Sequence, residues 1–132
     1  MRLGRIQNKY TQEGFDLVRS QGLDFIEICC NHPEDAEKED IKAQIARTGI
    51  EISCVGRWNH DIQENGAINE EKLEKYYLPL VDTAIELGAK TFVCGCNYDS
   101  SVSLFKNYQN AIYMFSRLIE RANGKIKVAI QN

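Results

Sequence analysis

The stretch Gly22-Leu23-Asp24-Phe25-Ile26-Glu27-Ile28-Cys29-Cys30 carries the clearest strand signal in the sequence. Its last six residues are apolar or β-branched apart from Glu27, which predicts a buried strand. Because side chains alternate along a strand, Glu27 is expected on the face opposite to its two isoleucine neighbours. Gly22 is typical of a helix end, and the pattern before it predicts a helix over residues 11–20 capped by Thr11.

Outward from this strand, short apolar runs alternate with longer segments of helical periodicity. Strands are expected at residues 3–6, 25–30, 50–55, 90–94 and 125–130, and helices at 11–20, around 41–48, 69–87 and 103–122, with a long loop at 56–69. Strict alternation of this kind predicts a parallel sheet built from βα crossovers, with the helices outside.

Two architectures fit that alternation. One is a five-stranded doubly wound sheet, which suits a chain of 132 residues. The other is part of a (β/α)8 barrel, a fold that needs about 250 residues when complete. Neither a glycine-rich dinucleotide fingerprint nor a phosphate-binding loop follows any expected strand, so a free-standing nucleotide-binding sheet has no support.

The helix expected at residues 69–87 has three distinguishing features. Asn69 can cap it, and Pro79 inside it removes one backbone hydrogen bond and should kink it. Its tyrosines and those of the last helix follow helical spacing, so they are interpreted as packing residues with hydroxyls in water: Tyr76, Tyr77, Tyr108 and Tyr113.

Composition limits the classes of function. The chain is 43% hydrophobic and 27% charged with a formal net charge of −3, which predicts one globular domain over residues 1–132 and argues against a nucleic-acid partner. No apolar run approaches the roughly 20 residues that span a bilayer, and the first residues lack the apolar segment of a signal peptide. A cytoplasmic location is therefore expected, without membrane association.

The five cysteines form no metal-binding motif of normal spacing. Cys29-Cys30 are adjacent and Cys94-Gly95-Cys96 has a gap of one residue, whereas structural zinc sites usually have gaps of two or more. All five cysteines follow or lie in apolar runs, so we expect reduced thiols in the core.

Four motifs in order favour the barrel. The segment Gly22 to Glu27 resembles the second-strand signature of the xylose isomerase-like TIM barrels, and Thr48-Gly49-Ile50-Glu51-Ile52-Ser53 resembles their entry into the third strand. Residues 84–93 (AIELGAKTFV) are similar to their helix-to-fourth-strand join, and residues 127–132 (KVAIQN) to their fifth strand. The resemblance implies the N-terminal half of such a barrel, with about four βα units and a fifth strand.

The resemblance also implies a chemistry. Members mostly isomerise or epimerise sugars or sugar phosphates, using a divalent metal (Mn, Mg, Zn or Co) to assist proton transfer next to a carbonyl. Their metal ligands, Glu, Asp, His and Glu, follow strands five to eight, and the first of these positions falls on Gln131 here. A neutral amide is a poor ligand for a hard cation and cannot accept the proton. This chain alone is therefore expected neither to hold the metal properly nor to catalyse the reaction.

The candidate substrate-binding residues are Glu27, Trp58, Asn59 and His60. The last three follow the third strand, at the rim where barrel enzymes bind their substrates, and an aromatic ring beside hydrogen-bonding side chains suits a sugar. The alternative for Glu27 is a structural ion pair, for example with Arg57, and the alternative for Trp58 is simple packing against the barrel.

Three functional hypotheses remain open at this point. The first is the N-terminal part of a sugar isomerase or epimerase, since the sequence stops inside a strand-like motif. The second is a non-catalytic half-barrel, a binding or scaffold protein that closes by forming a homodimer. The third is an endonuclease IV-like DNA-repair enzyme, which the acidic composition and the lack of a basic rim loop disfavour.

Overall fold

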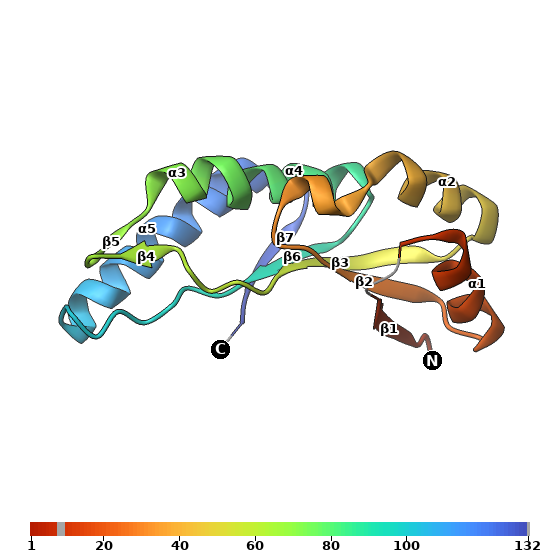
Figure 1. Cartoon of the computed structure of the whole chain (residues 1–132), viewed down its shortest axis with the longest axis horizontal. Helices are drawn as coiled ribbons and strands as arrows, with labels where there is room; N and C mark the ends of the chain where they lie inside the picture. Colours follow the sequence, from red (N-terminus) through yellow and green to blue (C-terminus); the bar gives the residue numbers. More distant parts are fainter. Residues whose placement is uncertain (8–9, 132) are drawn as a thin grey trace.

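The computed structural model describes residues 1–7 and 10–131. Its main feature is a five-stranded sheet in which all neighbouring strands are parallel (Figure 1). In spatial order the strands are β1 (Gly4–Gln7), β2 (Phe25–Cys29), β3 (Glu51–Arg57), β6 (Thr91–Cys94) and β7 (Lys127–Ile130). Spatial order equals chain order, so the sheet never reverses direction as a doubly wound sheet does. The partial-barrel prediction is therefore confirmed.

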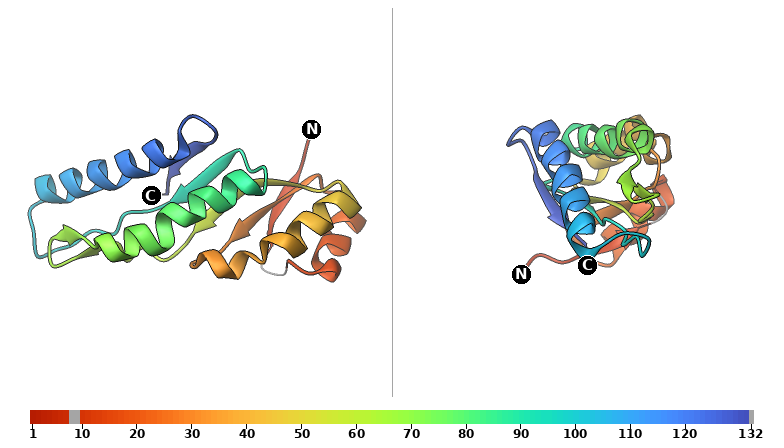
Figure 2. Two further views of the ribbon diagram at one scale, coloured as in Figure 1. Left: turned by 90° about the horizontal axis from the view of Figure 1, so that it is seen from above. Right: turned by 90° about the vertical axis from the view of Figure 1, so that its left-hand side faces the viewer.

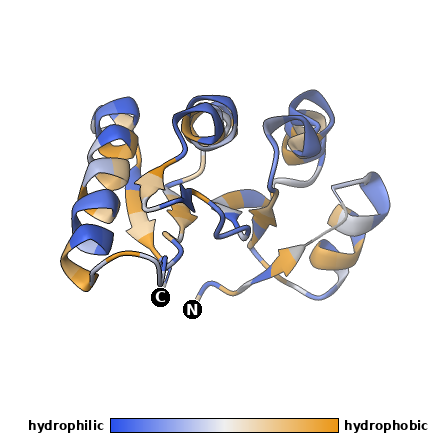
Figure 3. Cartoon of the chain, turned by 60° about the vertical axis from the view of Figure 1, so that its left-hand side comes forward, coloured by the Kyte–Doolittle hydropathy of each residue, from blue (hydrophilic) through white to orange (hydrophobic). Residues whose placement is uncertain are grey.

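Helices connect consecutive strands and cover one side of the sheet. They are α1 (Gln12–Ser20), α2 (Lys38–Thr48), the continuous segment α3 (Glu70–Lys72), η2 (Leu73–Tyr77) and α4 (Leu78–Glu86), and α5 (Leu104–Ala122), with a short 3-10 turn η1 (Pro33–Ala36) before α2. Figure 2 shows α4 and α5 lying side by side, and Figure 3 shows the helices as an arc around the strands. None of the helices in these residues is long and apolar enough to cross a membrane.

The core lies between the sheet and this helical layer. Ile26 and Ile28 of β2 are fully buried on the helix-facing side, against Phe15 and Val18 of α1 among other residues. The alternate residues of β2, including Glu27, are only partly buried and face the inner side of the arc. The alternation predicted from sequence is therefore the one that the fold uses.

Side-chain caps define two of the helix starts. The Asn69 Oδ1 accepts a hydrogen bond of 2.9 Å from the backbone N–H of Lys72, as predicted, and the Ser103 Oγ accepts one from Lys106. Thr11 occupies the N-cap position of α1, but its side chain makes no cap hydrogen bond there. The prediction therefore gave the correct N-cap residue, but not a side-chain hydrogen bond from it.

Pro79 lies next to a local irregularity of its helix. The N–H of Leu78 donates to the carbonyl of Leu73, five residues back, which makes η2 a π-helical turn. Pro79 has no N–H and cannot form the regular bond that follows, so the ladder changes register just before it. The kink expected at Pro79 stays a prediction.

The predicted long loop at 56–69 is wrong in two respects. Strand β3 continues through Arg57, and a hairpin of β4 (Gln63–Glu64) and β5 (Ala67–Ile68) occupies the second half of the loop. The hairpin turns at Asn65-Gly66, both with positive φ (52° and 76°). Asn-Gly is a strong hairpin signal because both residues tolerate this backbone region.

Candidate functional site

The candidate site lies along the carboxyl ends of β2, β3, β6 and β7. Adjacent strands are about 4.8 Å apart, so residues at the ends of neighbouring strands can contact one ligand. Trp58, His60 and Gln131 follow the ends of β3 and β7, and the side chain of Glu27, in the middle of β2, lies near Gly56 of β3. These four predicted residues are called the rim residues below.

Glu27 and Trp58 come together over Gly56. A Cβ at Gly56 would lie 3.4 Å from the Glu27 Oε1 and 3.5 Å from the Trp58 Nε1, so the absent side chain leaves room for both groups. Burial raises the pKa of the Cys29 thiol, and the Trp58 indole partly offsets that rise. The indole remains 46% exposed, which leaves it available to a ligand.

Glu27 is a carboxyl group in a partly dry environment. Burial raises the pKa of its carboxyl above the ordinary glutamate value. Within residues 1–7 and 10–131 it forms no salt bridge, and Arg57 pairs with Asp61 instead. The structural pairing of Glu27 with Arg57 considered above is therefore wrong.

His60 and Gln131 meet although they are 71 positions apart. The His60 Nε2 lies 3.4 Å from the Gln131 Oε1, and the imidazole packs directly on Gly95. Any side chain at position 95 would collide with the ring, since its Cβ would lie 2.5 Å from two ring atoms. Gly95, just after β6, thus creates the space in which the two rim residues meet.

Asn59 contributes to the candidate site through hydrogen bonds of its backbone. Its carbonyl accepts hydrogen bonds from the Arg57 guanidinium and the Tyr77 hydroxyl, and its N–H donates to the Asn31 Oδ1 at 2.9 Å. These bonds fix the path of the loop between Trp58 and His60. A direct role of the Asn59 side chain in substrate binding stays a prediction.

Arg57 is the site residue that the sequence did not identify in its actual role. Its side chain is 1% exposed, and its Nη1 lies 2.8 Å from the Asp61 Oδ1 and 2.7 Å from the Tyr77 hydroxyl oxygen. Burial would raise the pKa of Asp61, but the hydrogen bond and charge of Arg57, together with Lys72, outweigh it and lower that pKa. The sequence hinted at this cluster only by placing a charged residue at the end of an apolar strand.

Tyr77 departs from its prediction. It is fully buried, and its hydroxyl contacts Arg57, Asp61 and the Asn59 carbonyl, so the hydroxyl is not in water. Tyr108 and Tyr113 are 62% and 42% exposed, so neither is a core packing residue in this structure. Helical spacing alone does not show which tyrosines are buried, because that depends on the elements packed against each helix face.

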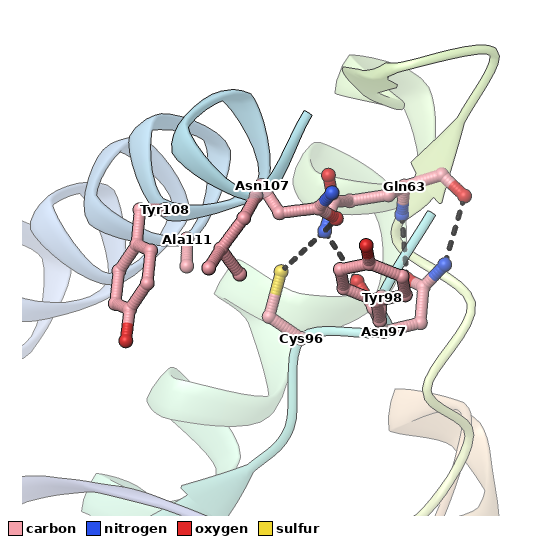
Figure 4. A pocket seen from close by; sticks show the side chains of 8 residues that line it. Gln63, Cys96, Asn97, Tyr98, Asn107, Tyr108 and Ala111 are labelled. Atoms are coloured by element: carbon pink, nitrogen blue, oxygen red, sulfur yellow. Dashed lines mark hydrogen bonds between the residues drawn. The ribbon is translucent and has the colours of Figure 1, made fainter. Parts of the chain in front are cut away.

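A separate cavity of about 190 Å³ lies beside the rim (Figure 4). The Gln63 side chain donates to the Asn107 Oδ1 and to the Cys96 thiol, and its Oε1 accepts from Asn110. The side-chain amides of Gln63, Asn107 and Asn110 therefore form hydrogen bonds with one another. The remaining wall is mainly apolar, which suits an apolar side chain better than a sugar: Cys96, Tyr98, Leu104, Tyr108 and Ala111.

The residues present do not make up a metal site. Among residues 1–7 and 10–131 there is no group of three His, Cys, Asp or Glu side chains that could hold an ion. At the predicted ligand position, Gln131 offers a neutral amide oxygen with a single imidazole nearby. All five cysteines are free thiols, and Cys30, Cys54 and Cys94 are buried, as expected for core residues.

No protein-family model and no curated protein sequence matches this chain. Solved structures do match, among them 3-keto-D-glucoside 4-epimerase YcjR from E. coli, with 19% identity, TM-score 0.78, and coverage of 98% of this chain and 55% of that one. The zinc-bound IolI protein matches with 16% identity and a TM-score of 0.74, over 98% of this chain and 51% of that one. A xylose isomerase domain protein from Planctomyces limnophilus matches with 11% identity and a TM-score of 0.68, over 100% of this chain and 52% of that one. This chain spans about half the length of each of these proteins. The likeness shows the fold of this chain, which is that of about half of a TIM barrel.

Proposed function

We propose that this chain forms the substrate-facing half of a sugar or sugar-phosphate isomerase or epimerase. Two contacts support the proposal: Glu27 and Trp58 meet over Gly56, and His60 and Gln131 meet beside Gly95. An exposed indole can stack on the apolar face of a sugar, while a carboxyl, an imidazole and an amide can bind its hydroxyls. That YcjR is an epimerase of a glucoside is consistent with this proposal.

The metal of such a reaction would need ligands from outside this chain. IolI carries a zinc atom, whereas the donors here are one imidazole and one amide oxygen. We therefore infer that Mn, Mg, Zn or Co, whichever the reaction uses, is held mainly by residues outside these 132. We assign this chain no chemical step at the metal, and we expect it to be catalytically silent alone.

One flank of α5 supports the proposal that residues outside these 132 complete the structure. The flank towards α4 is charged, with Arg117 bonded to Glu74 and Arg121 to Asp82. The opposite flank is apolar and bare, with four residues at least 60% exposed: Leu104, Tyr108, Ile112 and Ile119. A bare apolar flank of this length on a helix is typical of an association surface.

Two alternatives exist for what packs against this flank of α5. One is a set of further βα units that would complete an eight-stranded barrel, and the other is a second copy of this chain. Two copies would supply ten strands, because each sheet has five, whereas the barrel closes with eight. We therefore favour the complementary βα units and keep the homodimer as the alternative. A cytoplasmic location and the absence of a nucleic-acid partner, both expected from composition, belong to the same proposal.

Ligand-observed NMR on the 132-residue chain tests the proposed function. We expect saturation transfer to D-fructose, D-glucose or D-fructose 6-phosphate with dissociation constants in the millimolar range, since only half of a site is present. Trp58→Ala and Glu27→Gln should abolish the signal, whereas the control variants His32→Ala and Glu71→Gln should keep it. Absence of transfer to all three sugars, or transfer that survives the rim variants, would contradict the proposal, as would sugar interconversion by the chain alone.

A further inference from the structure

We infer that Arg57 is a positioning residue, which holds residues 58–61 (the rim loop) so that Trp58 and His60 face the substrate. This inference rests on the proposed function for the identity of the ligand. The placement of the two rings can be measured without any ligand.

The guanidinium of Arg57 joins three segments of the chain. Its Nε donates to the Asn31 carbonyl at 3.1 Å, and its Nη1 contacts the Asn59 carbonyl, Asp61 and the Tyr77 hydroxyl. The same group lies 4.1 Å from the centre of the Tyr77 ring, within cation–π range. One buried cation thus links the β2 loop, the rim loop and the helix that carries Tyr77.

Asn31 completes the hold on the rim loop from the other side. Its Oδ1 accepts from the backbone N–H of Trp58 at 3.2 Å and of Asn59 at 2.9 Å. Arg57 in turn binds the carbonyl of Asn31, so both contacts with the loop depend on the same two residues. The backbone of the rim loop is therefore fixed by Asn31 and Arg57.

This arrangement requires an arginine because the side chain at position 57 donates hydrogen bonds to several acceptors that lie in different directions. A planar guanidinium presents five donors in a fixed fork, whereas a lysine ammonium is a single point charge. A lysine at position 57 keeps the charge beside Asp61 but cannot reach the Asn31 and Asn59 carbonyls together. The difference between the two side chains therefore separates positioning from mere charge balance.

Arg57→Lys in the full 132-residue chain tests the inference, with Arg121→Lys as the matched control. Arg121 is a half-exposed residue that pairs with Asp82 on the helical layer, away from the rim. Trp58 is the only tryptophan, so its fluorescence and its indole Nε1–H NMR signal report on the rim loop without a label. We expect Arg57→Lys to keep the far-UV circular dichroism, to shift the indole signal, to make Trp58 easier to quench with acrylamide, and to weaken sugar binding about tenfold.

An unchanged indole signal and unchanged quenching in a folded Arg57→Lys protein would overturn the inference. If Arg57→Lys does not fold, Asn31→Ala decides, because it removes the other anchor of the loop and leaves the buried charge pair intact. The same indole shift in folded Asn31→Ala supports the inference, and its absence overturns it. Failure of the wild-type chain to bind sugar would refute the proposed function alone, since the indole signal is measured without ligand.

Discussion

The His60 Nε2 lies 3.4 Å from the Gln131 Oε1, so the loop after β3 is joined to the end of β7 across the intervening strand β6. The imidazole rests on Gly95, which follows β6, and this glycine makes the approach sterically feasible. The contact places Gln131, the residue at the expected metal-ligand position, within hydrogen-bonding distance of an imidazole.

Removing the imidazole should therefore release the Gln131 side chain. In His60→Ala we expect the side-chain amide signals of Gln131 to move in a ¹H–¹⁵N spectrum, because their carbonyl oxygen loses its partner. The control is His32→Ala, since the other histidine packs edge-on against Tyr76 at 4.6 Å. Equal effects of the two variants on Gln131 would contradict the contact.

Glu27→Gln should alter how stability depends on pH. Burial raises the pKa of Glu27, so the folded chain binds this proton more tightly than the unfolded chain does. Relative to Glu27→Gln, the wild-type protein should therefore lose stability as the pH rises from about 4.5 through the raised pKa, and level off above it. Urea unfolding at several pH values measures the difference.

The exposed Glu71→Gln variant is the control for that experiment. Glu71 lies on the exposed surface of α3, so this variant makes the same chemical change outside the rim. A Glu27→Gln profile parallel to that of the wild type would show that Glu27 ionises in the fold as it does in the unfolded chain.

Tyr77→Phe should destabilise the chain by about 1–3 kcal/mol, because the buried Arg57 guanidinium and Asp61 lose a hydrogen-bond partner. The matched control is Tyr113→Phe, whose hydroxyl accepts a hydrogen bond from Arg117 at the surface and should matter little. Chemical denaturation gives both values. Equal costs for the two variants would mean that the buried contacts around Tyr77 add no net stability.

The five thiols should differ strongly in reactivity. Burial raises the pKa of Cys30, Cys54 and Cys94 to about 12, which leaves almost no thiolate at neutral pH, and it also blocks access. Cys29 and Cys96 are only partly buried and should be alkylated first. Mass spectrometry after brief iodoacetamide treatment checks the order, and a urea-unfolded sample should react at all five. Early modification of Cys94 in the native chain would contradict the buried placement.

Ile112→Lys should weaken any association of the chain. Ile112 is 64% exposed on the apolar α5 flank, so a lysine there costs the single chain little but disrupts a docked partner. Light scattering over a range of concentrations measures the effect, and Gln109→Lys on a different flank adds the same charge as a control. A wild-type chain that stays monomeric throughout would remove the homodimer alternative and leave the complementary βα units to be tested.

The sequence alone determined the order and direction of the main elements. Apolar runs of strand length alternate with helical periods, and parallel βα crossovers are the arrangement that buries both. Strand alternation likewise determined that Glu27 lies opposite the buried Ile26 and Ile28, because this follows from the backbone geometry of one strand. The four family-like motifs added that these units curve into part of a barrel, a point that alternation left open.

Only the tertiary structure decided which side chains meet. Arg57 was considered as a partner of Glu27, but it contacts Tyr77, which is 20 positions away and comes into reach only when η2 packs on the sheet. His60 reaches Gln131 because Gly95, which follows the intervening strand β6, has no side chain. Such pairings depend on loop paths and on empty volume between elements, and neither has a period that can be read along the chain. Local periodicity thus fixed the elements and their faces, while packing between distant segments fixed the site.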